Sequence, residues 1–131
     1  MGGGRNGRGP IGRTGTSARL LKNLERARQE YGALSDNAIQ MTERKRSGVT
    51  GRRYTNDPQR EARQMFNVLA RGGRKIWSKD GKRITAYFRQ GSVTYRKHSS
   101  SDKSPTVQIH WRIQPSNGPR HQKIHFMKET K

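Results

Sequence analysis

The sequence predicts an α+β fold in which N-terminal helices pack on a four- to five-stranded antiparallel sheet. Two observations lead to this prediction. Apolar residues recur at a helical period of about 3.6 as far as Gly73, and beyond it they alternate with polar residues at a period of about two. We expect one domain over residues 16–131, with helices within 16–72 and the sheet within 73–128. A flexible Gly- and Arg-rich arm or linker is expected at residues 1–15.

The first helix is expected to follow a cap at Thr16 or Ser17 and to end near Gly32. Its apolar residues at helical spacing are Leu20, Leu21, Leu24, Ala27 and Tyr31. A shorter and weaker helix is expected over 35–46. Residues 47–55 have the composition of a loop.

A further helix has the clearest start signal in the chain. Asn56 or Asp57 can cap it, and Pro58 stands in the first turn, where a missing N–H costs nothing. Its apolar stripe consists of Ala62, Met65, Phe66 and Leu69. We interpret this stripe as core, with the helix ending at 71–73.

Five segments alternate between apolar and polar residues, as strands do when one sheet face is buried. They are 75–77, 84–89, 93–98, 107–113 and 123–126. Asp80-Gly81 is a hairpin signal between the first two segments, and Gln90-Gly91 turns the chain again. Loops are expected at 99–105 and 114–120.

The net charge of +20, from 29 Lys and Arg against 9 Asp and Glu, predicts a polyanionic partner. Nucleic acid is the first choice because phosphate neutralisation dominates such binding. An anionic membrane is not expected, because no basic helix with a strong aromatic apolar side is apparent and no apolar run is long enough to span a bilayer. No Cys is present, which excludes disulfides and thiolate metal sites.

The polar side of the alternation predicts a basic sheet face. Its residues on three strands are Thr94, Arg96 and His98, then Gln108, His110 and Arg112, then Lys123 and His125. These strands carry no Asp or Glu, and His121 borders the same face. This composition suits metal-independent RNA cleavage, in which the 2′-hydroxyl group is the nucleophile, His transfers protons and Arg or Lys stabilises the phosphoryl oxygens.

The candidate catalytic residues are His125, Arg96, Lys123, His110 and His98. Each histidine has an alternative role as a surface or RNA-contacting residue. The candidate RNA-binding residues are Tyr95, Ser104, Thr106, Arg112, Thr94 and Arg89. Neither a metal nor another cofactor is expected, because no carboxylate cluster and no ligand-spaced His set is apparent.

An ordered set of short motifs in residues 73–127 resembles C-terminal toxin domains of bacterial polymorphic toxins of the Rhs, contact-dependent inhibition and LXG types. The motifs are Val93-Thr94-Tyr95-Arg96, Ser104-Pro105-Thr106-Val107-Gln108-Ile109 and Gln122-Lys123-Ile124-His125-Phe126. Such toxins are often placed with the barnase–EndoU–colicin–RelE ribonucleases, and the resemblance implies the same helix-then-sheet architecture. It maps catalytic residues to Arg96, Thr106, Lys123 and His125, with Tyr95 and Ser104 alongside. Gln108 stands where an acidic residue is expected, which shifts a base role towards His110 or His98.

The resemblance implies a domain delivered as part of a larger secreted effector, acting on RNA in the target-cell cytoplasm. It also implies an immunity protein, which we expect to be acidic because complementary fields speed binding. Two other functions stay open from the residues alone. One is a non-catalytic nucleic-acid- or ribosome-binding protein, and the other is a toxin that cleaves DNA.

Overall fold

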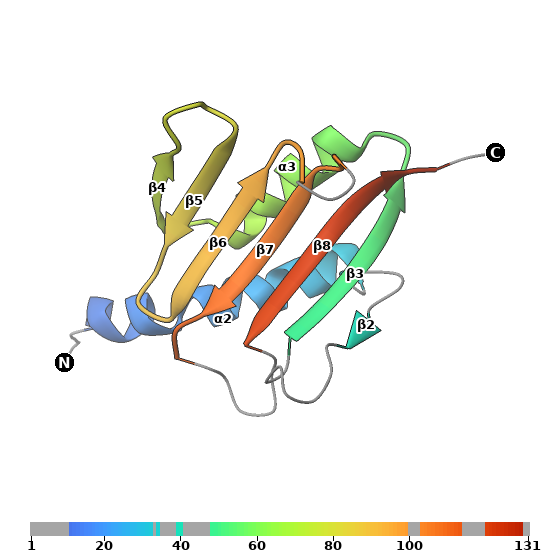
Figure 1. Cartoon of the computed structure of the whole chain (residues 1–131). Coiled ribbons are helices and arrows are strands. Elements are labelled where there is room, and N and C mark those ends of the chain that lie inside the picture. Colours follow the sequence, from blue (N-terminus) through green and yellow to red (C-terminus); the bar gives the residue numbers. More distant parts are fainter. Residues whose placement is uncertain are drawn as a thin grey trace.

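The computed structural model describes residues 11–32, 34, 39–40, 48–99, 103–113 and 120–129. Two helices lie on one face of a mixed, mostly antiparallel sheet, and no described helix covers the other face (Figure 1). This arrangement confirms the predicted α+β class. The elements in chain order are α2 (Ile11–Tyr31), β2 (Ile39–Gln40), β3 (Gly48–Thr55), α3 (Pro58–Leu69), β4 (Arg74–Trp77), β5 (Arg83–Tyr87), β6 (Gly91–Arg96), β7 (Thr106–Trp111) and β8 (His121–Lys128).

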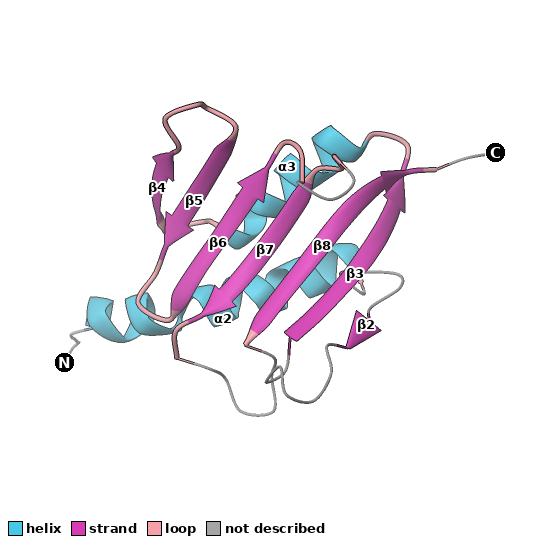
Figure 2. Ribbon diagram, in the orientation of Figure 1, coloured by secondary structure: helices cyan, strands magenta, loops and turns pink. Residues whose placement is uncertain are grey.

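The described sheet has seven strands in the order β2-β3-β8-β7-β6-β5-β4 (Figure 2). Strands β4 to β8 follow one another as antiparallel neighbours, as the alternation and the turn signals predict. Strand β3 instead pairs in parallel with β8, from Gly48 opposite His121 to Thr55 opposite Lys128. The sheet is therefore wider than predicted, and it is not purely antiparallel.

Strand β3 corrects the prediction of a loop at 47–55. Gly48 and Gly51 have a low strand propensity and weaken the strand signal in the sequence, although Val49, Thr50 and Tyr54 are favourable strand residues. Its partner β8 lies about seventy residues further along the chain, and local patterns carry no information on such pairing.

Two N-terminal predictions also change. Of the helix expected over 35–46, the described residues 39–40 form strand β2, paired with β3, and the others lie outside the described residues. Helix α2 begins at Ile11, inside the segment expected to be a flexible arm, and residues 1–10 lie outside the description.

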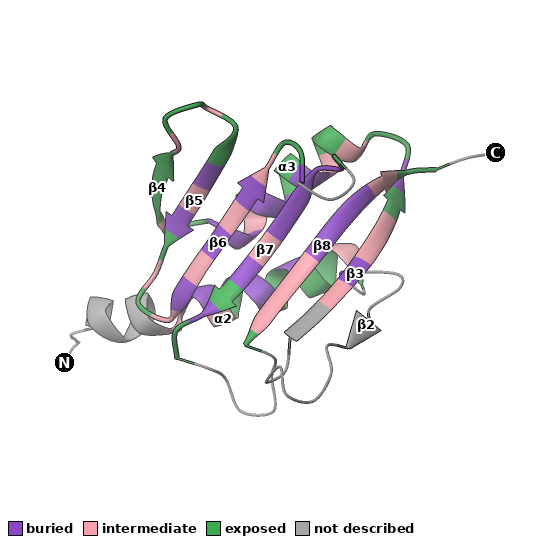
Figure 3. Ribbon diagram, viewed as in Figure 1, coloured by how far each residue is buried: buried purple, intermediate pink, exposed green. Residues whose placement is uncertain are grey.

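The core lies between the sheet and the two helices (Figure 3). Helix α3 forms as predicted, with Asp57 as the N-cap that accepts a bond from the Arg60 backbone N–H at 3.3 Å. Its predicted stripe is fully buried, with Phe66 at 0 % exposure. The stripe packs on the inward residues of the strands, which include Val93, Ile109, Trp111, Ile124 and Phe126, and on Leu20, Leu24 and Ala27 of α2.

One buried polar side chain joins the two helices. Asn23 on α2 is 3 % exposed, and its amide donates hydrogen bonds of 2.8 Å to the carbonyl oxygens of Leu69 and Arg71. Carbonyl groups at a helix C-terminus have no partner within the helix. Asn23 supplies these partners and thereby fixes α2 against the end of α3.

Candidate nucleic-acid interface

The open face is the face of the sheet that no described helix covers (Figure 1). Register partners in a sheet lie on the same face, so the pairing places the side chains of the open face in three rows across the strands. The basic row consists of Arg83, Arg96, Thr106, His125 and Arg52. The middle row consists of Ile76, Thr85, Thr94, Gln108, Lys123 and Thr50. The histidine row consists of Arg74, Tyr87, Ser92, His110 and His121.

The basic row brings three arginines onto one line without an acidic residue among its positions. The one ion pair found between described residues joins Arg53 and Glu61 at 2.6 Å. Arg53 follows Arg52 on β3 and therefore lies on the opposite face, which the helices cover. Arginine side chains close to one another raise the local positive potential, which a bound anion relieves. Their planar guanidinium groups match phosphate oxygens.

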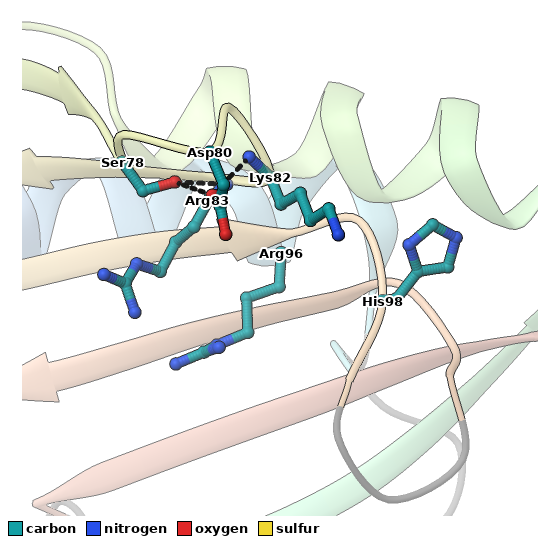
Figure 4. A pocket seen from close by; sticks show the side chains of 6 residues that line it. All are labelled: Ser78, Asp80, Lys82, Arg83, Arg96 and His98. Atoms are coloured by element: carbon teal, nitrogen blue, oxygen red, sulfur yellow. Dashed lines mark hydrogen bonds between the residues drawn. The ribbon is translucent and has the colours of Figure 1, made fainter.

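A pocket of about 160 Å³ opens beside two of these arginines, where β5 begins and β6 ends (Figure 4). Arg83 and Arg96 extend from neighbouring strands in the same direction, and Lys82 and His98 lie on another side of the pocket. The pocket is lined by Ser78, Asp80, Lys82, Arg83, Arg96 and His98. Cations therefore dominate its wall.

Asp80 is the acidic residue in this wall, and its carboxylate closes the predicted hairpin turn. It accepts hydrogen bonds from the Ser78 hydroxyl at 2.6 Å and from the Lys82 backbone N–H at 3.0 Å. These two bonds hold the pKa of Asp80 below its usual range, and the charges of Lys82 and Arg83 add to the effect. Gly81 completes the turn with a φ of 72°.

His125 lies in the basic row but is almost fully buried, at 8 % exposure. Its Nδ1 atom is 2.9 Å from the Ser104 hydroxyl oxygen, which fixes the ring. The backbone N–H of Phe126 donates to the Pro105 carbonyl oxygen at 2.9 Å, so residues 104–105 pack against this part of β8. Thr106, the register partner of His125 on β7, is 1 % exposed.

His110 and His121 form a pair in the histidine row. Their Nδ1 atoms are 2.9 Å apart and their ring centroids 4.4 Å apart, at an interplanar angle of 49°. Partial burial lowers the pKa of His121, and His110 and Arg120 lower it further. A hydrogen bond between these two atoms requires one ring to carry a proton on Nδ1 and the other ring to have none there.

The structure brings only part of the predicted catalytic set together. Arg96 and His125 share the basic row, His98 lies at the pocket, and Lys123 lies in the adjacent middle row. His110 lies four residues along β7 from Thr106, which is about 13 Å at the usual rise of a strand. This separation argues against the prediction that His110 acts at the same phosphate as His125.

The predicted RNA-binding residues also divide. The prediction that Tyr95 contacts RNA is wrong, because its side chain points into the core and the residue is 3 % exposed. Its ring centroid lies 6.1 Å from that of Phe66, and its hydroxyl group donates a hydrogen bond of 2.5 Å to the Gln59 side-chain oxygen. Thr94 lies on the open face, where its hydroxyl is 3.1 Å from that of Thr85. Ser104 and Thr106 are buried beside His125, whereas Arg89 and Arg112 are exposed just beyond strand ends.

Sequence reasoning missed Arg83, Lys82 and Arg52. Arg83 could have been found from the sequence, because it lies two residues before Thr85 and so belongs to the same alternating set as Thr85 and Tyr87. Arg52 was missed because β3 was interpreted as a loop.

Comparisons of the chain with family models, with curated proteins and with solved structures give no match. The described residues contain no group of three or more His, Asp or Glu side chains placed to hold a metal ion. No helix in the described part of the chain has the length and apolarity needed to cross a membrane. The resemblance to toxin domains thus stays a prediction.

Proposed function

We propose that this protein is a metal-independent endoribonuclease that cleaves cellular RNA (tRNA, rRNA or mRNA) through attack of the 2′-hydroxyl group on the adjacent phosphorus. The observation that carries the proposal is the basic row, in which Arg83, Arg96, Thr106, His125 and Arg52 are in register across five strands. A row of this kind offers cations for a phosphate and, two strands from Arg96, an imidazole on the same face. These are the groups that this reaction needs.

Arg83 and Arg96 bind the phosphate in this scheme. They are register partners, they line one pocket, and no described ion pair involves them. Two guanidinium groups can donate hydrogen bonds to the non-bridging oxygens and stabilise the negative charge that builds on them in the transition state. Lys123, in the next row, adds a third positive charge on the same face.

His125 and His98 transfer the protons. In this scheme His125 carries its proton on Nδ1, which lies 2.9 Å from the Ser104 hydroxyl oxygen. Its Nε2 atom accepts the proton of the 2′-hydroxyl as the 2′-oxygen forms its bond to phosphorus. His98 at the pocket donates a proton to the leaving 5′-oxygen as the P–O5′ bond breaks. The products are a 2′,3′-cyclic phosphate and a free 5′-hydroxyl group, and no metal-bound water takes part.

The proposed biological role is that of a toxin domain carried by a larger secreted effector and released into the cytoplasm of a target cell. The basis is the resemblance of its motifs to polymorphic toxin domains, together with the charge of +20. An acidic immunity protein is the proposed partner, because its field would complement the open face.

The test is incubation of the purified protein with total bacterial RNA in EDTA, followed by mapping of the product ends. Arg96→Gln and His125→Ala should each reduce cleavage by roughly 10²- to 10⁴-fold. Lys22→Gln on α2 removes a positive charge far from the open face and serves as the matched control, with unchanged cleavage expected. Full activity of both site variants, or loss of activity in EDTA, would refute the proposal.

A non-catalytic nucleic-acid-binding protein is the second candidate, and one observation favours it. The burial of His125 and its bond to Ser104 are also what a purely structural histidine would show. In that case the wild-type protein would bind RNA in a salt-dependent manner without cutting it.

A further inference from the structure

The histidine row differs in chemistry from the basic row on the same face. Ser92 on β6 is the register partner of both Tyr87 on β5 and His110 on β7. The small Ser92 side chain therefore separates Tyr87, which is 50 % exposed, from His110, which is also exposed. Neighbouring strands are about 4.8 Å apart, so the two ring-bearing residues stand roughly 10 Å apart.

The His110–His121 pair keeps the second of these rings in place. The hydrogen bond of 2.9 Å between the Nδ1 atoms restrains both rings, and partial burial lowers the pKa of His121. A restrained ring loses little conformational freedom when a flat ligand stacks on it. Tyr87 and His110 thus present two aromatic surfaces on one side of the sheet.

The charged groups around the row have the opposite sign to an RNA backbone. Arg74 is the register partner of Tyr87, Arg120 precedes His121, and Arg112 follows His110 at a distance of two residues. Arg112 and Arg120 are both exposed. Aromatic surfaces flanked by cations are typical of sites that stack bases and bind the adjoining phosphates.

The distance to the basic row fits a nucleotide beyond the two that the cleaved phosphate joins. His121 and His125 are four residues apart on β8, or about 13 Å, with Lys123 between them on the same face. This span exceeds the length of one nucleotide unit. A single strand that has its phosphate at Arg96 can therefore reach the histidine row with a base further along the chain.

We propose that Tyr87, Ser92 and the His110–His121 pair form a base-stacking subsite for single-stranded RNA, separate from the phosphate site of the basic row. This inference rests on the proposed function for the choice of RNA as the ligand. The stacked base belongs to a nucleotide that is not attached to the cleaved phosphate. The subsite therefore selects unpaired RNA, because bases inside a duplex are already stacked on one another.

The test is a binding titration by fluorescence anisotropy with a 2′-O-methylated RNA octamer, which has no 2′-hydroxyl nucleophile and stays intact. Tyr87→Ala and His110→Ala should each weaken octamer binding by about tenfold. Tyr87→Phe keeps the ring and should bind as the wild type does. None of these variants should alter binding of a 2′-O-methylated dinucleotide or of a duplex of equal charge by more than about twofold.

Two outcomes separate the inference from the proposed function. If Arg96→Gln weakens octamer binding while Tyr87→Ala does not, the subsite is refuted and the ribonuclease proposal stands. If Tyr87→Ala weakens binding of the octamer and the duplex equally, the tyrosine does not stack on a base and the subsite is again refuted. Thermal melting of each variant confirms that it is folded at the temperature of the titration.

Discussion

The two faces of the sheet are built from alternate residues of the same strands, yet they have opposite chemistry. On β6, Val93 and Tyr95 are buried against the helices, whereas Thr94 and Arg96 belong to the open face. On β8, Ile124 and Phe126 lie in the core, whereas Lys123 and His125, which alternate with them, belong to the open face. One face holds the fold together, and the other carries the basic row and most of the histidines.

This contrast separates stability from the proposed activity. Substitutions on the helix-covered face should lower the free energy of unfolding. Substitutions of exposed residues on the open face should change RNA binding at nearly constant stability. Because strand side chains alternate between the two faces, a shift of one residue in register would move the core residues to the open face and the polar residues into the core.

The largest effect on stability is expected from Phe66→Ala. Phe66 is fully buried in α3 and its ring lies near that of the inward residue Tyr95, so its removal leaves a cavity under the sheet. Such a change costs about 3–5 kcal/mol in the free energy of unfolding. Urea denaturation measures it, and a loss under about 1 kcal/mol would show that the core is not organised around this helix.

Asn23→Ala should have the next largest effect. It leaves the carbonyl groups of Leu69 and Arg71 without their donors at a buried site, which costs about 1–3 kcal/mol. The same denaturation experiment applies, with the exposed neighbour Lys22→Ala as the control for a change in helix propensity. Equal stability of the two variants would contradict the role of Asn23 in fixing α2 to α3.

Arg83→Gln addresses the open face. Arg83 is exposed and has no acidic partner within ion-pair distance among the described residues, so its loss should change the free energy of unfolding by less than about 0.5 kcal/mol. RNA affinity should fall, and the slope of log Kd against log salt should decrease by about 0.7 for one lost phosphate contact. An unchanged slope would remove Arg83 from the RNA-binding surface.

The smallest effect is expected at the His110–His121 pair. The pKa of His121 is lower in the folded state than the ordinary value of 6.5, so below about pH 6.5 the unfolded chain binds more protons than the folded one. The free energy of unfolding therefore falls as the pH drops below that value, until it passes the folded pKa. His121→Gln should make stability less dependent on pH in this range, as denaturation at pH 5.5 and 7.5 would measure.

The sequence predicted α3, the strands β4 to β8 and the two faces of the sheet, because each depends on local periodicity. It could not predict β3, whose two glycines weaken the strand signal and whose partner β8 is remote in the chain. The candidate site was predicted only in part, because its residues combine local alternation with pairing between strands. Alternation placed Arg96 and His125 on one face, but only the register shows that His110 pairs with His121 instead of His125.

The most direct test of the open face as a ribonuclease site uses a DNA oligonucleotide that contains a single ribonucleotide, incubated with the protein in EDTA. We predict one cut, immediately 3′ to the ribonucleotide, which leaves a 2′,3′-cyclic phosphate, and no cut in the all-DNA control. The Arg96→Gln variant should cut far more slowly at the same position. Cleavage of the all-DNA strand, or no cleavage of an oligonucleotide that the protein binds, would contradict the account.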